Sequence, residues 1–248
     1  MNFRSLGRSA LARLTPQPFY VFVNGLIAAR DIASRRRWAP EIEHLPLFVK
    51  PGDTVADIGA GHGLFTYHLS HLVGASGHVH AFEPIPLNLQ ILRHTIKRHG
   101  LGNVTVHAAG CGENKQRAQF GVPLENGIPS MGGSRQGGGG ISFDCDIVRL
   151  DDVLAGPVHF LKIDVEGAEL FALRGAARIL RSFHPAILFE AGSHTAHFGY
   201  EQQCVFDYLS ALGYRFLSGG FSGKPLEPRK SFLQPEDYFA VCDPLPRR

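Results

Sequence analysis

The nine residues VADIGAGHG, at positions 55–63, constrain this chain more than any other part of its sequence. The first of them continue a short, apolar and partly β-branched segment after a turn-forming Lys-Pro-Gly, which predicts a buried strand ending near Asp57. Glycines then alternate, and because glycine lacks a Cβ, they allow positive φ and close approach of a ligand to the backbone. Residues 64–73 predict a helix, so the loop faces a helix N-terminus.

The glycine spacing separates two kinds of nucleotide site. A dinucleotide dehydrogenase would carry G-x-G-x-x-G, but counting from Gly59 the third glycine position holds Leu64. The loop instead resembles the first motif of class I S-adenosylmethionine (SAM) methyltransferases, in which the acidic residue holds the methionine part of the cofactor. The alternative is a glycine-rich turn that binds nothing. The resemblance implies cofactor contacts from Asp57, Gly59, Ala60, Gly61 and Gly63.

A second acidic residue, Glu83, ends the alternating stretch 78–82 and is followed by Pro84, which stops the strand. Nucleotide-binding folds place an acidic side chain about twenty residues after the glycine loop, where it accepts the ribose hydroxyl hydrogens. We therefore predict that Glu83, with Pro84 beside it, contacts a ribose. The alternative is a solvated glutamate at the end of a strand.

Composition fits one soluble α/β domain. Of 248 residues, 44% are hydrophobic and 19% are charged, which excludes a disordered chain. The formal net charge of +3 is too small to predict nucleic-acid binding. No two of the four cysteines form a C-x-x-C pair, so neither a zinc site nor a disulfide framework is predicted, and a cytoplasmic location is the simplest expectation.

Residues 1–49 form a basic and apolar N-terminal arm ahead of the predicted domain at 50–248. Arginines flank an apolar stretch at 19–29, which is too short to span a bilayer and whose flanks fit a cleaved signal poorly. We expect a helix packed on the core. The alternative, a basic amphipathic helix that rests on a membrane surface or covers a substrate cleft, is not favoured.

Strand and helix patterns alternate from residue 55 onward, which predicts an α/β fold with a doubly wound, mostly parallel sheet. The last two strands are expected to be an antiparallel pair that completes seven. Helices are predicted at 87–99, 168–181 and 202–212, with Gly100 and Gly213 as C-terminal caps. The seven predicted strands are 53–58, 78–82, 104–108, 158–163, 186–189, 215–217 and 238–241.

An insertion at 110–155 separates the third strand from the fourth. It contains strand-like segments near 119–122 and 141–150 and four successive glycines at 137–140. Such a glycine run cannot hold a regular element. It predicts either a lid that orders over substrate or a plain hairpin loop.

The segment FLKIDVEGAEL, at 160–170, is the most specific in the chain. Lys162 and Asp164 share a strand face that a plain core strand would keep apolar, so these charges need partners. Strand carboxyl ends line the ligand crevice of an open α/β sheet, which places Asp164 beside the cofactor. KIDVEGAE, with DIGAGHG, FEPIPLN and the later PAILFE, resembles the FkbM-type SAM-dependent methyltransferases over residues 50–244.

That resemblance implies a Rossmann-like methyltransferase sheet, SAM as cofactor and O-methylation of a hydroxyl on a sugar, polyketide or other small metabolite. By position, Ala109 would lie at the adenine edge, where backbone groups or Cys111 would do the reading because no polar side chain is present. The resemblance does not identify the acceptor.

Methyl transfer to a hydroxyl requires alignment of the acceptor oxygen with the methyl carbon and removal of the hydroxyl proton. Candidates for the base are Asp164, Glu190 and His194, of which histidine titrates nearest neutrality. A Mg²⁺-assisted version using Asp164, Glu190 and a histidine is conceivable, but the spacing does not indicate a metal.

Three alternatives to an O-methyltransferase stay open at this point. The first is a non-catalytic SAM-binding or scaffold protein, which would bind the cofactor without methyl transfer. The second is an N- or C-methyltransferase, since the sequence does not announce the nucleophile. The third, an NAD-linked oxidoreductase, is disfavoured by Leu64. Oligomeric state is not indicated.

Overall fold

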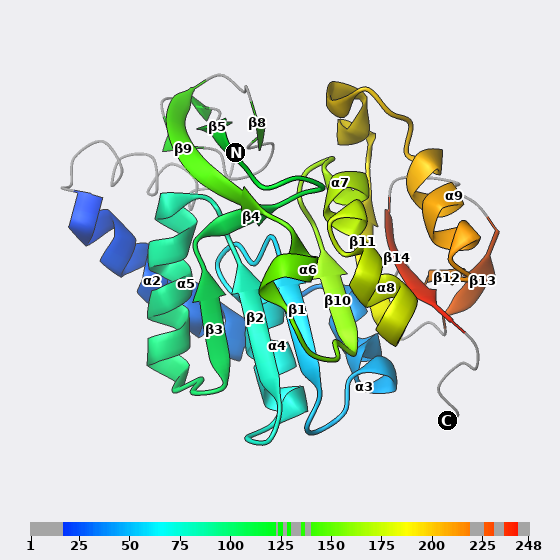
Figure 1. Cartoon of the computed structure of the whole chain (residues 1–248). Helices are drawn as coiled ribbons and strands as arrows, with labels where there is room; N and C mark the ends of the chain where they lie inside the picture. The colour runs from blue at the N-terminus through cyan, green and yellow to red at the C-terminus, as the bar shows by residue number, and fades with distance from the viewer. Residues whose placement is uncertain are drawn as a thin grey trace.

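The computed structural model describes residues 17–122, 124–125, 128–129, 135–136, 140–218, 226–230 and 236–242. Its central sheet runs in the order β13-β12-β14-β11-β10-β1-β2-β3 (Figure 1). The five strands from β11 to β3 are parallel to one another. Beyond β11, each neighbouring pair is antiparallel: β11 with β14, β14 with β12, and β12 with β13. In chain order they are β1 (Thr54–Ile58), β2 (His78–Phe82), β3 (Val104–His107), β10 (Phe160–Ile163), β11 (Ala186–Ala191), β12 (Arg215–Ser218), β13 (Glu227–Arg229) and β14 (Glu236–Val241).

The predicted α/β class and doubly wound, mostly parallel sheet are confirmed, and all seven predicted strands lie in the sheet. The structure adds an eighth strand, β13, whose sequence is Glu-Pro-Arg. Neither charge nor proline favours a strand interior, but proline is tolerated at a sheet edge, which is where β13 lies.

Helices cover both faces of the sheet (Figure 1). On one face, α4 and α3 pack with Val55 and Phe160, and α5 packs with Ala81 and Val104. On the other face, α7, α8 and α9 pack against β10 and β11. The helices are α2 (Gln17–Ala33), α3 (Leu45–Phe48), α4 (Leu64–Val73), α5 (Pro86–His99), α6 (Leu150–Val153), α7 (Glu169–Arg174), α8 (Ala177–Phe183) and α9 (Gln203–Ala211), with 3-10 turns η1 (Pro40–His44) and η2 (Ser193–Phe198).

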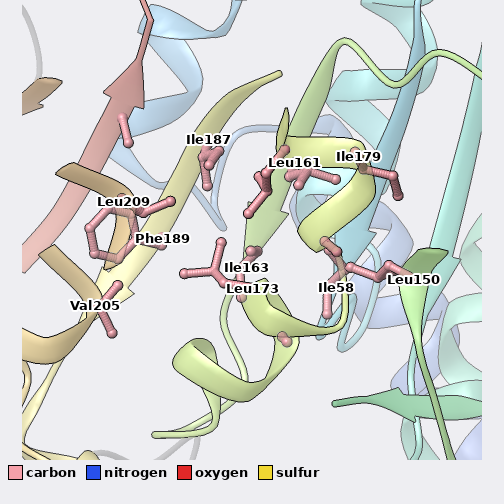
Figure 2. Close-up of a cluster of buried hydrophobic side chains, with 14 of the residues drawn as sticks. Ile58, Leu150, Leu161, Ile163, Leu173, Ile179, Ile187, Phe189, Val205 and Leu209 are labelled. Carbon is pink, nitrogen blue, oxygen red and sulfur yellow. The ribbon is translucent and has the colours of Figure 1, made fainter. Parts of the chain in front are cut away.

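The larger core cluster lies between the sheet and α7, α8 and α9 (Figure 2). Leu161, Ile163 and Ile187 alternate along β10 and β11 and meet Leu173 and Ile179 from the covering helices, all fully buried. Burial of a large aliphatic side chain contributes about 1.5–3 kcal/mol, so this cluster fixes the strand ends that carry the site.

One predicted helix is wrong in its extent. The segment 168–181 was predicted as one helix, but α7 ends at Arg174 and α8 begins at Ala177. The break falls where a Cβ on Gly175 would lie 2.1 Å from the carbonyl oxygen of Gly112. This contact with a distant segment gave no signal in the local helical pattern.

The insertion forms a second sheet with the order β4-β9-β5-β8. Its antiparallel pair, β5 with β9, joins the two strand-like segments expected near 119–122 and 141–150. Gly140 is described, whereas the rest of the predicted glycine run, 137–139, lies outside the described residues, so the lid stays a prediction. The strands are β4 (Ala109–Cys111), β5 (Gln116–Val122), β8 (Arg135–Gln136) and β9 (Ile141–Val148), with a separate pair β6 (Leu124–Glu125) and β7 (Ile128–Pro129).

The N-terminal arm forms α2, which packs along α5 as expected. Gly25 allows the close approach, because a Cβ there would lie 2.7 Å from Cγ of His94. Further along, Ile42, Leu45 and Phe48 are buried in the cluster that contains β1 and α4. No helix in the described ranges has the length and apolar character that crossing a membrane requires.

Candidate active site

The β1–α4 loop brings two different glycines to the carboxyl edge of the sheet. Gly59 has φ +79°, and a Cβ on it would lie 1.8 Å from the carbonyl oxygen of Asp164, so packing alone requires glycine there. Gly61, with φ +54°, has open space where its Cβ would be and lines a cavity. The loop therefore presses one glycine onto the neighbouring strand and presents the other to a ligand.

Glu83 follows β2 and holds this loop in place. Its Oε2 accepts the backbone N–H of Gly61 at 2.7 Å, and its Oε1 accepts the N–H of Ile85 at 2.8 Å and Nδ2 of Asn88 at 3.3 Å. Burial raises the pKa of Glu83, and these hydrogen bonds oppose that rise. Because each carboxylate oxygen has two lone pairs, Glu83 can still accept a donor from the cavity.

Asp57 lies behind the loop. Its side chain is fully buried, Oδ2 accepts the hydroxyl of Thr66 at 2.5 Å, and Oδ1 has no partner among the described residues. Burial raises its pKa, whereas the charge of Lys162 lowers it. Asp57 does not line the cavity itself, so its predicted contact with a methionine tail stays a prediction.

Lys162 and Asp164 form an ion pair at the end of β10. Nζ of Lys162 lies 2.9 Å from Oδ2 of Asp164 and 3.4 Å from the carbonyl oxygen of Gly59, so the predicted need for partners is met. Burial opposes both charges, yet the attraction between them wins, and the pKa of Lys162 is raised while that of Asp164 is lowered. Asp164 therefore stays ionised at the cavity wall.

The loop after β10 is shaped by hydrogen bonds from α7 and from Tyr200, which follows η2. Oε1 of Glu169 accepts the N–H of Gly167 at 3.0 Å, and the hydroxyl of Tyr200 donates to the carbonyl of Gly167 at 2.6 Å. Glu166 takes a positive φ of +54°, a conformation that non-glycine residues rarely adopt. Strain of this kind concentrates at functional sites, and Glu166 lines the cavity.

Glu190 and His194 flank this loop without lining the cavity. Burial, followed by the charges of Asp164 and Glu166, raises the pKa of Glu190 to about 8. Asp237, which pairs with Glu190 across β14 and β11, has its pKa raised to about 7 by burial and the charge of Glu41. Nε2 of His194 lies 3.7 Å from Oε2 of Glu166.

A cavity of about 340 Å³ joins these elements. Six of the predicted residues line it, and five do not. Ala60 packs with Leu92 in the core, and Gly63 begins α4. The lining residues from the prediction are Gly59, Gly61, Glu83, Pro84, Ala109 and Asp164. The predicted residues outside the lining are Asp57, Ala60, Gly63, Glu190 and His194.

Among the lining side chains that were not predicted are Asn88, Phe120, Phe171 and Phe198. Asn88 could have been predicted from the sequence, because it lies in the first turn of the helix that follows Glu83. The three phenylalanines come from β5, α7 and η2, and nothing in their local pattern distinguishes them from core residues. In the described part of the chain, no three His, Cys, Asp or Glu side chains are grouped so that they could hold a metal ion.

The family model described as methyltransferase FkbM domain matches residues 57–216, which run from the end of β1 to β12 and contain β10 and all residues that line the cavity. This chain belongs to the FkbM methyltransferase domain family. The match covers well over half of the chain and confirms the resemblance drawn from the motifs.

Two curated relatives share parts of the chain. The 31-O-demethyl-FK506 methyltransferase FkbM of Streptomyces tacrolimicus is 30% identical over 158 residues, which are 51% of this chain and 60% of that protein. A protein-L-isoaspartate O-methyltransferase of Ignicoccus hospitalis is 38% identical over 58 residues, 23% of this chain and 28% of that protein. The chain thus spans under two thirds of the length of either relative.

Solved structures share the fold. A methyltransferase FkbM from Methylobacillus flagellatus KT superposes with a TM-score of 0.51 at 19% identity, covering 88% of this chain and 59% of that one. A SAM-dependent O-methyltransferase from Thermotoga maritima gives 0.50 at 15% identity, with 89% and 72% covered. At these identities the likeness shows the fold, which is the Rossmann-like one of SAM methyltransferases.

The cavity residues fit SAM. The volume lies in the range of about 300–1,000 Å³ that small-molecule sites occupy. Ile85, Phe120 and Ile147 offer apolar walls for an adenine ring, and Asp164 offers a negative charge to a cation. Oδ1 of Asn88 is buried, lines this space and has no partner among the described residues, so it can accept a ligand donor.

Proposed function

We propose that this chain is a SAM-dependent methyltransferase that methylates a hydroxyl oxygen of a small metabolite, such as a sugar or polyketide. The observation that carries the proposal is one cavity that joins the Gly59–Gly61 loop and Glu83 to the ion-paired Asp164. The family supports methyl transfer, and the Streptomyces and Thermotoga proteins are both named for methylation of oxygen.

In this proposal Glu83 and Asn88 bind the ribose, while Pro84 and the backbone from Ala109 onward face the adenine. Gly61 leaves room for the ligand, and Asp57 acts from behind the loop. When bound, SAM supplies an electrophilic methyl group. A carboxylate near that cation stabilises it most where water is excluded, which is the role proposed for Asp164.

The acceptor hydroxyl loses its proton as its oxygen forms the new bond to carbon. Asp164 is the candidate base that touches the cavity. Glu190 is hydrogen-bonded to Asp164, and His194 lies beside Glu166, so in the proposal both are positioning residues that act through those carboxylates. The pKa of Glu190, about 8, lets it hold a proton near neutral pH.

Calorimetric titration with S-adenosylhomocysteine tests the first half of the proposal. We expect a Kd of about micromolar order for the unmodified chain and at least about hundredfold weaker binding for Glu83→Ala. NADH is the control ligand and should not bind. Absence of binding by folded protein, or equal binding by the variant, would remove the cofactor assignment.

Methyl transfer is then measured with labelled SAM and a panel of hydroxylated, amino and carbon-acid acceptors. Product on a hydroxyl supports O-methylation, whereas product only on nitrogen or carbon contradicts it. Cofactor binding without any product favours the second candidate, a non-catalytic SAM-binding protein. That candidate is supported by the position of Glu190 and His194 outside the cavity lining.

A further inference from the structure

Positive charge is concentrated at the start of the chain. Positions 1–37 hold seven of the 25 Lys and Arg residues and one of the 22 Asp and Glu residues, which is a net charge of +6. The remaining 211 residues hold 18 basic and 21 acidic residues, which is a net charge of −3. The small overall charge therefore conceals a basic segment, residues 1–37, joined to an acidic remainder.

Helix α2 has two distinct faces. Gly25, Ala28 and Ile32 are buried, with Ala28 packed on Ile91 of α5. An adjoining face carries Phe22, Leu26 and Arg30, all exposed and spaced four residues apart, and the Phe22 ring meets His94 of α5 edge to face at 5.8 Å. On an α-helix this spacing gives a stripe about 12 Å long. Packing on α5 therefore accounts for one face of α2 only.

The exposed stripe is unusual for this molecule. Phe22 is 51% exposed and Leu26 is 39% exposed. Among the described residues one other large apolar side chain is exposed, Ile141 on β9, at 50%. Two of these three side chains thus lie one turn apart on one helix, one turn before exposed Arg30. Exposed Arg35 and Arg36 follow the end of the helix, and Arg35 lies over the Trp38 ring at 4.6 Å.

We propose that this stripe, Phe22, Leu26 and Arg30 with Arg35 and Arg36, binds the surface of an anionic lipid bilayer. Apolar side chains can enter the boundary between headgroups and acyl chains while arginines contact lipid phosphates. A nucleic acid would give Phe22 and Leu26 no apolar environment. A protein partner needs about 800 Å² on each side, which two exposed apolar side chains do not supply.

The geometry keeps this contact apart from the cavity. None of the five stripe residues lines the cavity, so membrane contact and cofactor binding are separable. The stripe also lies on a helix whose inner face is already packed, so contact requires no unfolding of α2. Substitutions on the outer face should therefore leave the fold unchanged.

Vesicle sedimentation tests the surface with the full chain. Phosphatidylcholine vesicles are compared with vesicles in which about a quarter of the lipid is phosphatidylglycerol, at low and high salt. We expect binding to the anionic vesicles alone, weakened by salt. The double variant Phe22→Ser/Leu26→Ser and the charge reversal Arg30→Glu should each lower the partition coefficient at least about tenfold.

Two matched controls are available. Ile141→Ser removes an equally exposed apolar side chain, and Arg181→Glu, at an exposed position of α8, makes the same charge change away from α2. Both should bind vesicles like the unmodified chain, and every variant should keep S-adenosylhomocysteine affinity or, should that ligand not bind, the same unfolding midpoint. Absence of vesicle binding, equal losses in the controls, or self-association that the double variant abolishes would overturn the proposal.

Discussion

Two glutamates at the same edge of the sheet lie in opposite surroundings. Glu83, after β2, is surrounded by donors from Gly61, Ile85 and Asn88. Glu190, on β11, is surrounded by carboxylates, and its pKa rises to about 8. Burial raises the pKa of both, but only Glu83 has hydrogen bonds that oppose the rise. One end of the edge is therefore built to accept hydrogen bonds and the other to retain a proton.

The largest loss of stability is expected for a substitution of Gly59, which lies between the Glu83 end and the Glu190 end of this sheet edge. Gly59→Ala places a Cβ 1.8 Å from the carbonyl oxygen of Asp164 at a φ of +79°. We expect a loss of at least about 3 kcal/mol in the free energy of unfolding, measured with urea. Gly61→Ala is the matched control, since its Cβ meets open space and adds about 1–2 kcal/mol of backbone strain alone. Equal losses would show that the strand contact is not tight.

The second largest loss of stability is expected on removal of Lys162, the buried cation at the Glu190 end of the sheet edge. Lys162→Met leaves Asp164 without its partner at 2.9 Å. Loss of one partner of a fully buried pair costs about 3–5 kcal/mol, and because the Asp164 side chain is 40% exposed we expect about 2 kcal/mol. The loss should be larger at pH 8 than at pH 5, where neighbouring carboxylates gain protons. A loss independent of pH would indicate packing rather than charge.

Glu190→Gln should change the pH dependence of stability. A folded pKa of about 8, above the ordinary 4.5, means that the native state binds the proton more tightly, so this stabilisation is complete below pH 4.5 and declines as pH rises to about 8. The variant should lose that decline and become relatively more stable at pH 8, by about 1 kcal/mol after allowance for partial exposure. Urea midpoints from pH 4.5 to 9 measure it.

Asp237→Asn is the companion measurement for Glu190→Gln. Its pKa of about 7, against an ordinary 3.8, gives the same sign, with the decline complete by about pH 7. A native state whose stability rises with pH through this window in the unmodified chain would contradict both assignments.

The smallest effect is expected at His194. Its contact with Glu166 is 3.7 Å long and its side chain is 43% exposed, so His194→Gln should change the free energy of unfolding by less than about 0.5 kcal/mol. If His194 only positions Glu166, methyl transfer should fall less than about tenfold with an unchanged KM. A loss near the hundredfold expected for a proton acceptor would instead make it the base.

Local pattern was sufficient for much of this molecule. Helix α4 begins at Leu64 and ends at Val73 as predicted, because the glycines before it and the apolar period within it are local signals. The same holds for Glu83, whose place depends on a strand end and a following proline. Lys162 and Asp164 were also predictable, since alternating charge on a buried strand requires an ion pair.

Long-range contacts were not predictable in this way. Asp151 accepts the N–H groups of Arg178 and Ile179 and so caps α8, a partner 27 residues away that the spacing does not reveal. Phe120 on β5 of the second sheet and Phe171 on α7 line the same cavity. The raised pKa of Glu190 depends on the ends of β10 and β11 lying beside the start of β14, which only the folded sheet determines.

The contact between Gly112 and Gly175 fixes the position of the root of the inserted hairpin. The two backbone segments meet there with no side chain between them, so the residues before β5 are held directly against the turn between α7 and α8. Beyond β5 and β9 no comparable constraint is described. Under the proposed function, exchanging the hairpin tip between relatives while β5 and β9 are kept should change the acceptor preference and leave S-adenosylhomocysteine affinity unchanged.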